Sequence, residues 1–189
     1  ERVAATNLTR FTQWLAAERG LTFTDYAALW RWSVSDLAGF WSAIWDHYQV
    51  TADSPPDEIV SDLSMPGAQW FKGARLNYAE HLLRHEAVAA PDEIAFVHST
   101  EIRPQATMTW GELGGRVRRL ATKLRAIGIK PGDRIVSYLP NVPETAIAMM
   151  ATVGIGAVWS AAAPEFGATT VIERFEQIAP RLAFVSDGY

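Results

Sequence analysis

Apolar residues in the first 50 positions recur at intervals of three and four, the spacing of amphipathic helices. The pattern predicts three helices in a helical N-terminal extension, residues 1–50. Asn7 or Thr9 is expected to cap the first helix, and Ser33 or Ser35 the third. A stripe this rich in Trp is expected to pack on a larger surface. Its members, in helix order, are Phe11, Trp14 and Leu15; Phe23, Tyr26, Leu29 and Trp30; Leu37, Phe40, Trp41, Ile44, Trp45 and Tyr48.

Residues 51–89 show no sustained period and predict an irregular connecting segment. Ser54-Pro55-Pro56-Asp57 and Met65-Pro66-Gly67 are turn signals. The motif WFKGARLN follows, from Trp70 to Asn77. Asn77 is expected to cap a short helix that reaches Arg84.

Strand-like and helix-like runs alternate in residues 90–189. Thr109-Trp110-Gly111-Glu112 forms a capping box for the first helix of this region, and Asn141 is expected to cap the second. From residue 134 the order is βαβαβ, the half-unit of a doubly wound parallel sheet. The expected fold class is therefore α/β, a Trp-rich helical region followed by part of a doubly wound parallel-sheet subdomain. Strands are expected at 93–98, 107–109, 134–139, 157–160 (buried) and 182–186, and the last helix at 169–177.

Composition places the chain among globular proteins, with 49% hydrophobic and 20% charged residues. The net charge of −4 argues against nucleic-acid binding, which needs a clustered basic face. Arg116, Arg118 and Arg119 form the tightest basic cluster and are interpreted as a solvated helix face. The chain has no cysteine, which excludes disulfides and thiolate chemistry. No apolar run of about 18 residues occurs, so we expect no membrane partner. The absence of cysteine fits a reducing compartment, and we expect a cytoplasmic protein.

Candidate chemistry gathers in one loop. Ala163, Pro164, Glu165 and Phe166 follow the strand expected at 157–160, and the carboxyl ends of parallel strands are where open sheets bind ligands. Glu165 and Glu173 flank this loop, although Glu173 fits a solvated helix face better than an acid–base role.

Other motifs exclude several site classes. Gly154-Ile155-Gly156 leaves a helix and enters a strand, the reverse of a dinucleotide fingerprint. His81 and His85 share a helix face without the glutamate of a zinc motif, so no metal site is expected. No Walker loop or GxSxG elbow occurs. The residues alone therefore predict a possible ligand loop and no catalytic apparatus.

Four segments carry a resemblance to a known family: SVSDLAGFWSAIWDHYQV, WFKGARLNYAEHLL, PGDRIVSYLPNVPE and LPNVPETAIAMMATVGIGAVWSAAAPEFG. In this order they resemble short-chain acyl-CoA synthetases of the adenylate-forming superfamily. The loop Pro164-Glu165-Phe166-Gly167 resembles the Ser-Pro-Asp-Phe-Gly form of acetoacetyl-CoA synthetases, and differs from the Gly-Gly-Phe-Ser type of the acetate- and propionate-using enzymes. Ala163 and Glu165 depart from that form, which has Ser and Asp there.

The resemblance implies an acetoacetate–CoA ligase that uses ATP with Mg²⁺ to form an acyl-adenylate and then transfers the acyl group to coenzyme A. It implies that Ala163, Pro164, Glu165 and Phe166 line the coenzyme A tunnel. It also implies that the phosphate loop, the adenine- and ribose-binding motifs and the catalytic lysine lie beyond residue 189. Residues 90–189 would then be a partial AMP-binding subdomain without catalytic residues, inactive alone, whose partners are the small acid and the remainder of its own chain.

Two alternatives stay open. A ligase for acetate, propionate or butyrate would share these segments, because the acid pocket is formed mainly by later residues. A non-catalytic interaction module would use the exposed apolar surface of a half-domain to bind a partner.

Overall fold

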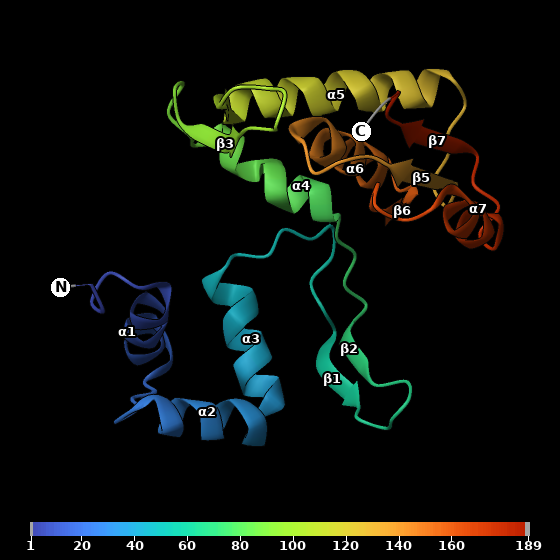
Figure 1. Cartoon of the computed structure of the whole chain (residues 1–189). Helices are drawn as coiled ribbons and strands as arrows, with labels where there is room; N and C mark the ends of the chain where they lie inside the picture. The colour runs from blue at the N-terminus through green and yellow to red at the C-terminus, as the bar shows by residue number, and fades with distance from the viewer. Residues whose placement is uncertain (1, 188–189) are drawn as a thin grey trace. The chain divides into compact units, whose positions relative to one another are not determined.

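The computed structural model describes residues 2–187, and the chain divides into two compact units, Glu1–Leu76 and Asn77–Tyr189 (Figure 1). The first unit contains helices and one hairpin. The second contains a hairpin, a three-stranded parallel sheet and its helices.

Three helices form the first part of the N-terminal unit, as predicted: α1 (Asn7–Arg19), α2 (Tyr26–Ser35) and α3 (Leu37–His47). Their caps differ from the prediction. Thr6, Asp25 and Asp36 accept hydrogen bonds from the amides three residues on, which satisfies donors that the first turn leaves free. Asp36 both ends α2 and begins α3. The residues predicted as caps, Asn7, Thr9, Ser33 and Ser35, lie inside the helices.

The core of this unit is small and aromatic. Phe11, Leu15, Leu29 and Ala43 are buried. Partly buried residues surround them, and several of their rings meet edge to face, a favourable arrangement of ring quadrupoles. These surrounding residues are Trp14, Leu21, Phe23, Trp32, Phe40 and Ile44.

The segment predicted to be irregular contains an antiparallel hairpin of β1 (Glu58–Asp62) and β2 (Gln69–Lys72), with Val60 opposite Trp70. The sequence did not indicate it, because the strands are short and a register shift between Val60 and Asp62 breaks the two-residue alternation.

Trp70 and Phe71 both contact α3, although consecutive strand residues normally point to opposite faces. The Trp70 ring lies 6.0 Å from that of Trp41, and the Phe71 ring stacks on Trp45 at 4.9 Å. The backbone of Phe71 has φ 48°, a left-handed conformation that interrupts the alternation. The Trp-Phe pair of the motif therefore has a structural role.

The second unit opens with α4 (Tyr78–Leu83), capped by Asn77 as predicted. The Asn77 side chain accepts from the Ala79 and Glu80 amides and donates to the Val153 carbonyl at 3.0 Å. One amide side chain thus caps α4 and joins it to a later helix. A 3₁₀ turn, η1 (Arg84–Ala87), follows.

A second hairpin, β3 (Ile94–His98) and β4 (Ala106–Thr109), leads into α5 (Trp110–Ala126). The strands predicted at 93–98 and 107–109 are present and pair antiparallel, and the predicted capping box of Thr109 and Glu112 is formed.

The remaining elements confirm the predicted βαβαβ order: β5 (Arg134–Tyr138), α6 (Pro143–Gly154), β6 (Val158–Ala162), α7 (Ala168–Glu176) and β7 (Leu182–Val185). All pairings are parallel, in the order β6-β5-β7. Asn141 does not cap α6, which begins with Pro143 after Val142. The prediction that the strand after α6 is buried was wrong, since β6 is an edge strand and Val158 is 48% exposed.

An ion pair fastens η1 to α5. Arg118 donates two hydrogen bonds to the Glu86 carboxylate, at 2.6 and 2.7 Å. This carboxylate lies against Gly114, one helical turn before Arg118, where a Cβ would collide with it. The hydrogen bond from Arg118 outweighs desolvation and lowers the pKa of Glu86.

Neighbouring glycines of α5 provide a matched test of this contact. Gly115→Ala should stabilise the unit by about 0.5–1 kcal/mol, because alanine favours helix over glycine and the new Cβ would make only an ordinary contact with the Arg119 side chain. Gly114→Ala should be less stable than wild type, because the new methyl group displaces the Glu86 carboxylate from its ion pair. Urea unfolding of both variants measures the difference, and equal gains would contradict it.

The same ion pair predicts a pH dependence. Because the folded-state pKa of Glu86 is lowered, its stabilisation is present above the unfolded-state pKa and is lost as the pH falls through the folded-state pKa. Glu86→Gln and Arg118→Gln should therefore each lose less stability on acidification than wild type, as measured by unfolding between about pH 6 and 3. If the free energy of unfolding of both variants falls with pH as steeply as that of wild type, the ion pair does not have this role.

Candidate functional site

The chain reverses its direction across the parallel sheet after β6. It passes from β5 to β6 on one side, then returns across β5 to β7 on the other. Because such crossovers are almost always right-handed, the reversal places α6 and α7 on opposite faces. The loops that follow β5 and β6 therefore separate at their carboxyl ends. We call this place, between the loops after β5 and β6, the switch point. It lies at the carboxyl ends of the strands, where open α/β sheets bind ligands.

Burial agrees with this arrangement. Ile135 belongs to the core formed with α5 and α6. The next residue, Val136, is equally buried and lies outside that core, as does the buried Val171 of α7. The two faces of β5 thus belong to two different packing layers.

A tyrosine holds the loop that follows β6. Tyr138 is the last residue of β5, and its hydroxyl lies 2.9 Å from the Pro164 carbonyl and 2.7 Å from that of Phe166. The loop is itself a tight turn, since the Phe166 amide donates to the Ala163 carbonyl at 3.1 Å. A phenol has one hydrogen, so the two carbonyls share it.

The structure brings the four predicted site residues together on this turn at the switch point. Ala163 and Glu165 are exposed, and Pro164 is half-buried. Phe166 is 41% exposed, and the Arg174 guanidinium carbon lies 4.9 Å from its ring centroid, a cation–π contact. The turn thus offers a mainly apolar surface with one carboxylate. The apolar part of this surface suits an uncharged chain. Glu173 lies on the exposed side of α7.

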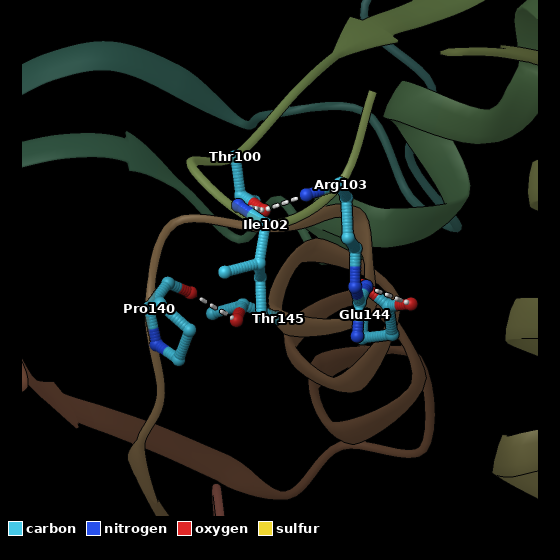
Figure 2. Close-up of polar contacts among 6 residues, drawn as sticks. All are labelled: Thr100, Ile102, Arg103, Pro140, Glu144 and Thr145. Atoms are coloured by element: carbon cyan, nitrogen blue, oxygen red, sulfur yellow. Dashed lines mark hydrogen bonds and ion pairs between the residues drawn. The ribbon is translucent and has the colours of Figure 1, made fainter. Parts of the chain in front are cut away.

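The other side of the switch point is the stretch from Pro140 to Thr145, where the Thr145 hydroxyl donates to the Pro140 carbonyl at 2.7 Å. The loop between β3 and β4 is tied to this stretch (Figure 2). Arg103 donates to Glu144 in the first turn of α6 at 3.0 Å. Sequence reasoning missed this contact, because the partners are 41 residues apart and Arg103 lies outside the segments that carry the resemblance.

Opposing effects act on Glu144. Desolvation raises its pKa, but its own backbone amide, Arg103 and the charge of His98 together outweigh desolvation and lower it. Glu144 is therefore ionised at neutral pH, and the link to Arg103 is an ion pair.

Two cavities lie elsewhere. One of about 450 Å³ is bordered by α4, α5 and α6, and another of about 520 Å³ lies beside Arg84 and Trp110. The second includes His81 and His85, the latter paired with Glu93. Desolvation and the charge of Arg84 lower the pKa of His81. Within residues 2–187, no three His, Asp or Glu side chains gather to hold a metal ion. No helix there is long and apolar enough to cross a membrane.

Comparison with family models shows which protein family the chain belongs to. Residues 83–188 match the family described as AMP-binding enzyme, and residues 26–82 match the acetyl-coenzyme A synthetase N-terminus. The chain belongs to the AMP-binding enzyme family. This confirms the resemblance and the α/β fold class predicted from the sequence.

Individual relatives of this chain carry more specific names than the family. An acetoacetyl-coenzyme A synthetase of Rhizobium meliloti is 41% identical over the whole chain. The solved structure of an acetoacetyl-CoA synthetase from Streptomyces lividans is 46% identical, with a TM-score of 0.93 over the whole chain. A malonamoyl-CoA synthetase of Penicillium aethiopicum is 33% identical over 97% of the chain. The chain spans only 28%, 29% and 26% of these proteins, respectively.

The contact of the Tyr138 hydroxyl with the Pro164 and Phe166 carbonyls, called the strap below, can be tested directly. Tyr138→Phe removes the hydroxyl and should destabilise the unit by about 1 kcal/mol. Amide exchange at Ala163–Gly167 should accelerate more than exchange in β5. Tyr78→Phe, on an exposed ring, is the control and should leave both quantities unchanged. Unaltered exchange in the Tyr138 variant would mean that the loop is held by other contacts.

Proposed function

We propose that the protein carrying this chain is an acetoacetate–CoA ligase, and that residues 1–189 correspond to its N-terminal portion. The observation that carries the proposal is similarity along the whole chain, at 41% and 46% identity, to two proteins named acetoacetyl-CoA synthetase. The Pro164-Glu165-Phe166-Gly167 loop at the switch point adds support. The resemblance associates this loop with the acetoacetyl-CoA synthetase form and not with the acetate-using type.

We further propose that Ala163, Pro164, Glu165 and Phe166 line the tunnel for coenzyme A. The pantetheine arm of coenzyme A is a long, uncharged chain with two amides. The Ala163, Pro164 and Phe166 side chains can contact the arm without burying a charge, and the Glu165 carboxylate can accept a hydrogen bond from an amide of the arm. The strap from Tyr138 supports this role, because it fixes the turn before the ligand arrives and lowers the cost of ordering it on binding.

The chemistry proposed for the whole protein has two steps. The carboxylate oxygen of acetoacetate attacks the α-phosphorus of ATP, and pyrophosphate leaves with Mg²⁺ as counterion. The thiol sulfur of coenzyme A then attacks the activated carbonyl, loses its proton, and AMP leaves. ATP, Mg²⁺ and coenzyme A are therefore the proposed cofactors. The described residues contribute to holding coenzyme A, and we assign no step of adenylation to them.

The proposed organisation has three parts: a helical extension at residues 1–50, a connecting segment at 51–89 with the WFKGARLN motif, and part of the AMP-binding subdomain at 90–189. The proposed partners are the small acid and the remainder of the polypeptide, with no nucleic acid or membrane. The proposed location is the cytoplasm, where ATP and coenzyme A are available and a cysteine-free chain needs no oxidising compartment.

A ligase for a different short acid is the second candidate. The malonamoyl-CoA synthetase shows that a protein similar over 97% of this segment is named for another acid. Similarity over this segment therefore does not identify the acid, which has to be determined by experiment.

Acid-dependent ATP–pyrophosphate exchange by the full-length protein tests the proposal. Acetoacetate should exceed acetate, propionate and butyrate in kcat/KM by about tenfold or more, because a pocket built for a polar keto group penalises acids that leave its donors unpaired. Malonamate belongs in the same series. A higher kcat/KM with any other acid would replace acetoacetate as the substrate.

The 189-residue chain alone is the companion experiment. It should release no pyrophosphate from ATP with acetoacetate, because the groups that the resemblance assigns to adenylation are not among these residues. Acid-dependent release by this chain would contradict that assignment.

A further inference from the structure

The loop between β3 and β4 borders the switch point without belonging to the sheet. Figure 2 shows it over the first turn of α6, with the side chain of Ile102 directed toward the stretch between Pro140 and Thr145. That stretch follows β5 and faces the loop after β6 across the switch point. The hairpin loop therefore lies on the α6 side of this edge of the sheet. Phe166 lies on the other side of the same edge.

This hairpin loop is locally ordered by its own hydrogen bonds. The Thr100 hydroxyl accepts from the amides of Ile102 and Arg103, at 3.3 and 2.9 Å. The backbones of Thr100 and Arg103 exchange two further bonds, at 3.0 and 3.3 Å. Such a turn holds its tip in one conformation, which is the condition for a preformed contact surface.

At the tip, Ile102 is 91% exposed. Single exposed apolar residues are common and need no explanation. Ile102 differs because its turn is fixed at both ends and is anchored to the switch point by the pair of Arg103 and Glu144. The pair is neutral overall, and the exposed Glu101 beside Ile102 adds a negative charge. This side therefore carries no positive charge for a polyphosphate, and the Ile102 side chain suits an uncharged ligand segment.

We propose that the β3–β4 loop is a second wall of the coenzyme A site, in which Ile102 contacts the pantetheine arm opposite Phe166. Arg103 and Glu144 are positioning residues that hold the wall at the switch point. This inference rests on the proposed function. The competing possibility is that the acid substrate or another part of the polypeptide contacts the β3–β4 loop. The test distinguishes these contacts from contact with coenzyme A.

The first arm of the test uses Ile102→Ala in the full-length protein. Its KM for coenzyme A should rise by about tenfold, the effect of removing a few methyl or methylene contacts. ATP–pyrophosphate exchange should be unchanged, because it requires no coenzyme A. Val97→Ala is the matched control, since Val97 lies in the same hairpin and is 61% exposed. It should match wild type in both assays.

The second arm tests positioning. Arg103→Ala and Glu144→Gln should each raise the KM for coenzyme A by about threefold, and the double variant should add little to either, as expected for two residues that act through one contact. The melting temperature should stay close to wild type, because the paired side chains are 54% and 52% exposed and such pairs contribute little stability. Arg103→Lys should restore part of the affinity.

The outcomes are distinct. A wild-type protein that forms no acyl-CoA with any acid defeats the proposed function and this inference together, before any variant is made. An active wild type with Ile102→Ala indistinguishable from Val97→Ala overturns the second wall alone. Loss of exchange in Ile102→Ala, with an unchanged KM for coenzyme A, would assign the wall to the acid or to another segment and would equally overturn the proposal.

Discussion

Parallel pairing around β5 is the constraint on which the second unit depends. Parallel neighbours cannot be joined by a tight turn, so each connection requires a helix that packs on the sheet. With β5 in the centre and its neighbours added on opposite sides, the helices must cover both faces. One residue of β5, Ile135, then completes the core with α5 and α6, while the next, Val136, is buried on the other face. The separation of the two carboxyl-end loops follows from this order alone.

Much of the α/β part could be predicted because its signals are local. The capping box of Thr109 and Glu112 sets the start of α5, and the alternation of strands and helices after residue 134 sets the connection order. The strand order β6-β5-β7 is a different kind of information. It depends on which edges meet, and no local pattern distinguishes it from β5-β6-β7. The misjudged burial of β6 has the same origin, because an aliphatic run looks alike at an edge and in the centre.

The site was predictable only in part. The turn from Ala163 to Phe166 could be located, because it follows a strand and carries a recognisable motif. Tyr138, Arg103 and Glu144 could not be assigned roles, since each acts on a residue at least 26 positions away. A similar limit applies to Phe71. Its left-handed backbone accompanies the contacts of Trp70 and Phe71 with Trp41 and Trp45, whereas propensity alone would have assigned it to a regular strand.

Both outer strands of the three-stranded sheet are paired on one side only within residues 2–187. Val158 on β6 and Val185 on β7 are also substantially exposed. Unpaired strand edges that carry apolar side chains can pair with those of another molecule. The isolated segment is therefore expected to self-associate as its concentration rises. Its hydrodynamic size should be followed across a dilution series before any property of the segment is attributed to a monomer.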